Sequence, residues 1–159
     1  MSFRERLDKY LEWTLVVLMS LLVVDVLWQV ISRYVLTAPS SFTDELAGFL
    51  LIWVGLLGSA YVTGKNEHLA IDMLLQRSGE KRQRILRLII HILIAVFALF
   101  VLIIGGAWLV YTRFYLNVNS AALRIPLGYV YLILPLSGLI VLYYTLDNTK
   151  KIFLNRSLA

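Results

Sequence analysis

The sequence contains no cysteine, only two histidines and only three prolines. Without cysteine the chain can form neither a disulfide nor a thiolate metal site, and it has no thiol for catalysis. It also lacks an HExxH sequence, a phosphate-binding glycine loop and a Ser-His-Asp arrangement. Charged residues make up only 16% of the chain, hydrophobic residues make up 60%, and the mean hydropathy is +0.78. We therefore expect neither an enzyme nor a soluble domain.

Long apolar stretches are what the sequence does contain. A helix needs about 20 apolar residues to cross the hydrocarbon core of a bilayer. Four stretches come close to that length, namely Trp13–Ile31, Leu46–Val62, Ile92–Tyr111 and Leu127–Leu146. The predicted fold is therefore all-α, an integral membrane protein with four transmembrane helices in a single domain over residues 1–159. The predicted spans are about 11–36, 43–63, 81–115 and 126–147.

Shorter signals refine this prediction. Residues 69–76 are too few to span a bilayer, and we predict a short helix that lies in the membrane interface. Ser41 and Asp44 have the spacing of an N-cap pair at the start of the second span. Pro126 suits the first turn of the fourth span, and Pro135 should kink that span.

The Lys and Arg residues lie almost entirely on one side of the four predicted spans. All but three of the 15 fall in the N-terminal segment, in the connection between the second and third spans, or in the C-terminal tail. The exceptions are Arg33, Arg113 and Arg124. Connections rich in Lys and Arg stay in the cytoplasm, so we predict that both termini are cytoplasmic. The same rule accounts for the net charge of +5 without a nucleic-acid partner.

Asp25 is the costliest residue to bury, because it lies near the middle of the first predicted span. Gln29 and Arg33 follow at intervals of four residues and share its helical stripe, so Gln29 could bridge the two charges. One interpretation is an ion or proton site. The other is a polar seam that docks this helix against another. We favour the seam, because a single carboxylate without neighbouring ligands makes a poor cation site.

Two further groups of residues suggest contacts with a partner. Gly48, Gly55 and Ser59 form a small-residue face on the second span, which would pack either against another protein or within this chain. The sequence does not separate these alternatives. Asp44 and Glu45 open the same span, where acidic side chains offset the helix dipole. Alternatively, they form with Arg33 a charged rim that contacts a partner outside the membrane.

Several segments together resemble the small membrane subunit of tripartite ATP-independent periplasmic (TRAP) transporters, the DctQ-like family. They are Gln29–Val35, Phe42–Ala47, Trp53 and Glu67–Asp72, in this order and spacing. The chain length and the four-span topology match as well. One departure is Gly48, where such proteins often carry Arg, so we expect no charged role at this position.

The resemblance implies a non-enzymatic subunit in the bacterial inner membrane. Its partners would be a large, multi-span permease subunit and a periplasmic binding protein that delivers a carboxylate solute, such as a C4-dicarboxylate or a sialic acid. A sodium gradient would drive uptake through the large subunit, and the small subunit would extend the fixed scaffold without a cofactor of its own. A chain with four spans and one buried acid is a poor transporter by itself, which agrees with this role.

Two other functions remain open at the level of the sequence. The chain could anchor haem in a membrane oxidoreductase, for which His68 and His91 are the only histidine ligands. It could also be a small autonomous channel or exporter.

Overall fold

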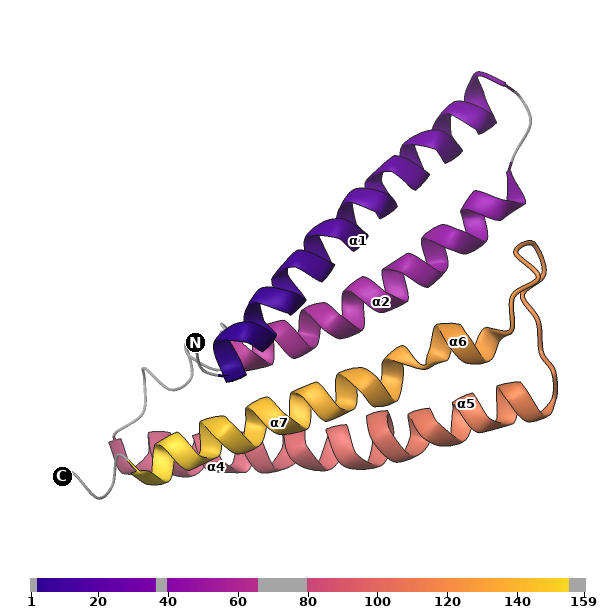
Figure 1. Cartoon of the computed structure of the whole chain (residues 1–159). Helices are drawn as coiled ribbons and strands as arrows, with labels where there is room; N and C mark the ends of the chain where they lie inside the picture. The colour runs from indigo at the N-terminus through magenta and orange to yellow at the C-terminus, as the bar shows by residue number, and fades with distance from the viewer. Residues whose placement is uncertain (1–2, 37–39, 66–79, 155–159) are drawn as a thin grey trace. The chain divides into compact units, whose positions relative to one another are not determined.

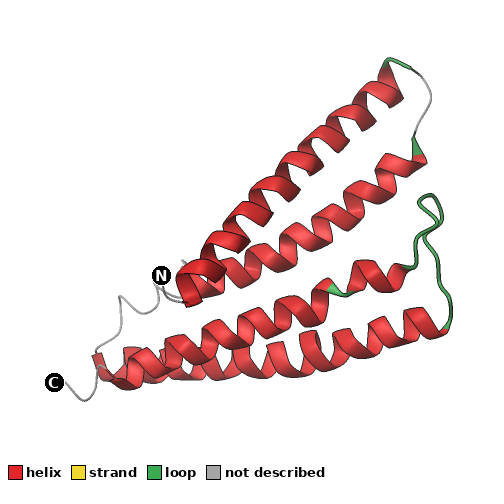
Figure 2. Cartoon of the chain, viewed as in Figure 1, coloured by secondary structure: helices red, strands yellow, loops and turns green. Residues whose placement is uncertain are grey.

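The computed structural model describes residues 3–36, 40–65 and 80–154 (Figure 1). Its helices in chain order are α1 (Phe3–Tyr34), α2 (Ser41–Lys65), α4 (Glu80–Phe97), the π-helix η1 (Ala98–Gly105), α5 (Gly106–Tyr115), α6 (Leu127–Tyr131) and α7 (Ile133–Leu154). Within the described ranges the chain has no strand, only one isolated antiparallel bridge between Asn119 and Pro126 (Figure 2). The predicted interfacial helix at 69–76 lies outside the described residues, as does His68.

Four helical segments are long and apolar enough to cross a membrane, which confirms the predicted fold class. They are Phe3–Tyr34, Ser41–Lys65, Ile85–Tyr115 and Leu127–Lys150. The first begins well before the predicted position of about 11, because its charged opening is also a good helix former. Arg4 and Asp8 lie four residues apart there, as do Glu5 and Lys9. Opposite charges at this spacing stabilise a helical turn.

The start of α2 differs by one residue from the predicted N-cap. Ser40, not Ser41, occupies the capping position, because Ser41 is already the first helical residue. The Ser40 hydroxyl oxygen accepts the N–H of Thr43 at 3.5 Å, and the Thr43 hydroxyl donates to the Ser40 carbonyl at 3.0 Å. The predicted pair of Ser41 with Asp44 is therefore wrong, and Asp44 is left to face Arg33.

The chain divides into two compact units. The first comprises Met1–Gly58 and Trp108–Ile133, and the second comprises Ser59–Ala107 and Leu134–Ala159. The division runs through α2 and falls near the start of α5 and of α7, so that each unit takes parts of the same helices. The single domain predicted for residues 1–159 stays a prediction, and each unit is described by itself.

In the first unit, α6 packs closely against α5 at Gly128. A Cβ atom at this glycine would lie 2.5 Å from a ring carbon of Phe114, so any larger residue would require the Phe114 ring to move. The Phe114 ring meets Tyr129 edge-on at 5.1 Å between centroids. The Arg113 guanidinium lies 5.7 Å from the centre of the Tyr131 ring, within reach of a cation–π interaction.

In the second unit, two glycines bring η1 and the start of α5 close to α7. A Cβ at Gly106 would lie 2.7 Å from the Leu134 Cβ and 3.0 Å from the Pro135 Cδ. A Cβ at Gly138 would lie 2.8 Å from the Leu102 Cβ. Small residues permit this approach of backbones, which is how membrane helices gain contact area.

The end of α2 belongs to the same unit and is tied to α7. Tyr144 is fully buried, and its ring fills the space beside Gly64, where a Cβ would be 2.9 Å from ring atoms. The buried side chain of Asn148 donates to the Thr63 carbonyl at 3.1 Å. A polar side chain inside a membrane protein is stable when it is bonded in this way.

Two irregularities interrupt the long helices. The sequence did not predict η1, in which the N–H of Gly106 reaches back five residues to the Val101 carbonyl. The second irregularity is a break of the fourth span at Leu132, between α6 and α7 (Figure 2). An interruption of this span was predicted from Pro135. Proline has no N–H to donate to the Tyr131 carbonyl four residues back, and its ring crowds that carbonyl.

Candidate functional site

Glu45, near the start of α2, is bound by the loop between α5 and α6, residues 116–126. Its carboxylate accepts four hydrogen bonds. The Ser120 hydroxyl donates to Oε2 at 2.6 Å, and the N–H of Ala121 donates to Oε1 at 3.1 Å. The N–H groups of Ala122 and Leu123 donate to Oε2 at 2.8 and 3.0 Å. Both carboxylate oxygens are therefore engaged within the chain.

The 116–126 loop is preorganised to hold this carboxylate. It closes on itself through the N–H of Ser120, which donates to the Ile125 carbonyl at 2.9 Å, and the N–H of Arg124, which donates to the Ser120 carbonyl at 3.2 Å. Asn117 and Arg124 have φ values of 48° and 55°, a left-handed conformation that non-glycine residues seldom adopt. Successive N–H groups in such a turn converge into a concavity that binds an anion, and Glu45 fills it.

Arg33 and Asp44 join the end of α1 to the start of α2. Arg33 Nη2 lies 3.6 Å from Asp44 Oδ1, and the side chains are 51% and 46% exposed. The structure thus brings together two of the three residues of the predicted charged rim. An exposed ion pair of this kind contributes little to stability. Because both side chains are about half exposed, they retain surface for other contacts. Glu45, the third residue, is directed into the loop.

Asp25 and Gln29 lie on the same stripe of α1. Asp25 is buried, with 7% of its surface exposed, and its Oδ2 accepts no hydrogen bond from any described residue. Gln29 is half-buried. Its side chain makes no hydrogen bond to Asp25 or Arg33 in the described part of the chain, so the bridge expected from the sequence is not formed there.

The glycines of the small-residue face of α2 are open in the first unit. A Cβ atom added at Gly48, Gly55 or Gly58 would meet no described heavy atom within 4 Å. Gly48, Gly55 and Ser59 are exposed, and Gly58 is half-buried. The glycines that pack helices within the chain are others, such as Gly128 and Gly106.

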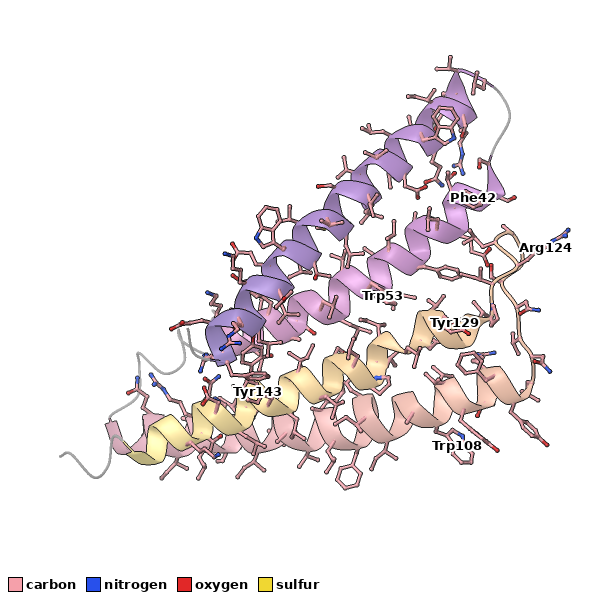
Figure 3. All side chains as sticks on the ribbon, viewed as in Figure 1. Phe42, Trp53, Trp108, Arg124, Tyr129 and Tyr143 are labelled. Carbon is pink, nitrogen blue, oxygen red and sulfur yellow. The ribbon has the colours of Figure 1, made fainter. Side chains whose placement is uncertain are left out.

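Trp53 has a role that the sequence did not suggest beyond packing. Its indole N–H donates to the Val130 carbonyl at 3.0 Å (Figure 3). Val130 lies two residues before the break at Leu132, so the indole ties α2 to the segment beside this break. No local signal in the sequence could identify this acceptor, because it lies 77 residues along the chain.

Comparison with known proteins identifies the family. The model of the DctQ component of tripartite ATP-independent periplasmic transporters matches residues 22–154. A TRAP transporter small permease protein of Haemophilus influenzae is 28% identical over 142 residues, which cover 88% of this chain and 85% of that protein. The sialic acid TRAP transporter permease protein SiaT of Haemophilus influenzae is 30% identical over 97 residues, which cover 60% of this chain and 15% of that protein.

These findings confirm the resemblance given by the sequence motifs. Proteins of this family are transporter subunits and not enzymes, and the small permease works with a large permease subunit. Four helices able to span a membrane agree with a multi-pass membrane protein. The chain therefore belongs to the DctQ family and is the small permease component of a TRAP transporter.

Proposed function

We propose that this chain is a fixed scaffold for the large permease subunit of a sodium-driven TRAP transporter in the bacterial inner membrane. The large subunit would carry the substrate and sodium sites and would move during transport. A periplasmic binding protein would deliver a carboxylate solute, such as a C4-dicarboxylate or a sialic acid. The small subunit would need no cofactor. The observation that carries the scaffold role is the binding of Glu45 by the 116–126 loop.

This contact supports a static subunit for a physical reason. Hydrogen bonds to an ionised acceptor are among the strongest in proteins, and here they join residues separated by about half of the chain. Three of the donors are backbone N–H groups of Ala121, Ala122 and Leu123, which cannot rotate away as side chains can. An end of the molecule fastened in this way is suited to hold a neighbour and not to move with a substrate.

The relation to SiaT supports the large permease as partner. The matched 97 residues make up only 15% of that protein, so its chain joins a segment like this one to a much longer permease sequence. Segments fused in one chain commonly work side by side. The name of that relative also makes a sialic acid one candidate solute here. Sodium and the solute remain proposals for this chain.

The open face of α2 is our candidate for the contact with the large subunit. Gly48 and Gly55 are exposed and have no described neighbour in their unit, whereas a helix of another protein could approach them closely. This favours the partner alternative over packing within the chain. Ser59 continues the face by one helical turn beyond Gly55.

Substitution of Gly55 by leucine tests this contact. A leucine side chain would hold the two helices apart at a cost of roughly 1–3 kcal/mol, which corresponds to a loss of complex of roughly 5- to 150-fold. The matched control is Ala107→Leu, which adds similar bulk at an exposed position of α5. We expect the large permease to co-purify with the control and not with Gly55→Leu. Equal recovery with both variants would refute the contact.

Arg33 and Asp44 are candidates for contact with the binding protein, because their side chains are about half exposed and Glu45 is occupied within the chain. Charge complementarity can orient such an encounter without high affinity. Asp44→Lys should lower uptake while the two membrane subunits still co-purify. Unchanged uptake over a range of binding-protein concentrations would reject this role.

Asp25 keeps its two interpretations, and we favour the seam over an ion site. In the described part of the chain it does not belong to a group of three or more acidic or histidine side chains able to hold a metal. On the seam interpretation, Asp25→Ala weakens recovery of the large subunit more than it alters the sodium requirement of uptake. A variant that assembles normally but needs a different sodium concentration would favour the ion site.

The two alternatives from the sequence have direct tests. Haem bound by His91 and His68 would give a Soret band in the purified protein, and membership of a transporter family gives this function no support. An autonomous channel would give solute flux when the chain is reconstituted alone. We expect neither signal.

A further inference from the structure

Three aromatic side chains form an exposed row along α5. Trp108, Tyr111 and Tyr115 are 71%, 61% and 74% exposed. Their spacing of three and four residues places them on one helical face. The ring centroids are 6.2 Å apart between Trp108 and Tyr111 and 5.9 Å apart between Tyr111 and Tyr115. Figure 3 shows Trp108 on the side of α5 that faces away from α6.

Tyr129 on α6 provides a fourth exposed ring, beside the C-terminal part of the aromatic row of α5. Tyr129 is 58% exposed and meets Phe114 edge-on, and Phe114 lies between Tyr111 and Tyr115 in α5. The row is therefore not confined to one helix. The opposite side of α5 packs within the chain, because Arg113 on that side contacts the Tyr131 ring.

The ends of α1 and α2 carry exposed rings at this end of the unit as well. Tyr34 is 76% exposed and Phe42 is 49% exposed, and they flank the connection between these two helices. The ion pair of Arg33 with Asp44 and the hydrogen bonds of Glu45 place the end of α1, the start of α2 and the 116–126 loop at the same end of the first unit. Every helix of the unit thus presents an aromatic side chain near this end.

The surrounding sequence indicates what covers these rings. No Asp, Glu, Lys or Arg lies between Arg87 and Arg113, and the 116–126 loop that follows α5 contains Asn117, Asn119 and Arg124. The rings therefore stand where the charge-free stretch ends at Arg113 and a polar loop follows. Trp and Tyr combine an apolar ring with a polar edge, and they concentrate at the headgroup level of a bilayer.

We propose that Trp108, Tyr111, Tyr115 and Tyr129 bind the phospholipid headgroup region and fix the depth of this end of the chain in the membrane. This face of α5 would then contact lipid and not another protein. The proposal goes beyond the scaffold function and does not depend on it, because it concerns only the first unit and the bilayer.

Brominated phospholipids test the depth. The full-length protein, with the membrane proteins that co-purify with it, is placed in vesicles of phosphatidylcholine brominated either close to the headgroup or near the end of the acyl chains. The emission of Trp108 is obtained as the difference between the native protein and Trp108→Phe. We expect a greater loss of this emission with bromine close to the headgroup. Equal loss at both depths, or no loss at either, would overturn the proposal.

A photo-crosslinking residue at Tyr111 provides a measurement that does not rely on fluorescence. Benzoylphenylalanine keeps the phenyl ring of tyrosine and adds a benzoyl group, which the exposed site should accept without loss of folding because Tyr111 is 61% exposed. After irradiation in native membranes, we expect adducts of the mass of one phospholipid. A crosslink to the large permease, or to any other protein, would show that this face is a protein interface and would overturn the proposal.

Discussion

Gly105 and Gly106 are adjacent, yet alanine should have opposite effects at the two positions. A Cβ at Gly106 would lie 2.7 Å from the Leu134 Cβ, 3.0 Å from the Pro135 Cδ and 3.1 Å from the Pro135 nitrogen. These atoms belong to the backbone, to the first side-chain carbon or to a proline ring, so rotation of a side chain cannot relieve the clash. The nearest atom to a Cβ at Gly105 is the Phe100 carbonyl oxygen at 3.5 Å, an ordinary contact.

The magnitude follows from two terms. Alanine favours a helix over glycine by about 0.8–1.0 kcal/mol, and this gain applies to both variants. Overpacking costs about 1–3 kcal/mol and applies to Gly106→Ala alone. The difference between the two variants isolates the steric term, so Gly106→Ala should be less stable than Gly105→Ala by about 1–3 kcal/mol.

The assay is equilibrium unfolding in mixed detergent micelles, followed by far-ultraviolet circular dichroism. The native protein and the two variants are measured side by side, and the free energies of unfolding are compared. We expect Gly105→Ala to be at least as stable as the native protein. If Gly106→Ala proves as stable as Gly105→Ala, the close packing of α5 against α7 is refuted.

Three other predictions test the remaining contacts and the orientation. Trp53→Phe removes the hydrogen bond to the Val130 carbonyl and should lower the free energy of unfolding by about 0.6–1.7 kcal/mol, the range for polar contacts in membranes, whereas Trp108→Phe should leave it unchanged. Glu45→Gln replaces one acceptor oxygen by an NH₂ group that faces the N–H donors of the loop, so amide hydrogen exchange over residues 120–124 should accelerate; unchanged exchange would argue against the contact. A reporter active only in the periplasm should stay silent when fused after Ala159, since high activity would reverse the predicted orientation.

The one-dimensional features of the chain could be predicted from the sequence. Span length depends on how many apolar residues lie in a row, and this count predicted four spans, with α2 and the third span within a few residues of their observed bounds. A helix break near Pro135 was predictable because a missing N–H is a local property. The helix α1 begins at Phe3, before the predicted span start of about 11, because apolarity marks the bilayer and not the end of a helix. The family could be recognised from the motifs within residues 29–72, because their order and spacing can be read from one sequence.

Contacts between distant segments could not be predicted, because they depend on which helix faces meet. Glu45 lies beside Asp44 in the sequence and belongs to the same acidic pair. Asp44 faces Arg33, whereas Glu45 is held by Ser120 and its neighbours. One residue along a helix changes direction by about 100°, so neighbouring acids face different partners. Likewise, nothing in the sequence by itself distinguishes the surroundings of Gly48 from those of Gly106. Only the tertiary structure decides that Gly106 is packed within the chain, because its neighbours Leu134 and Pro135 come from another span.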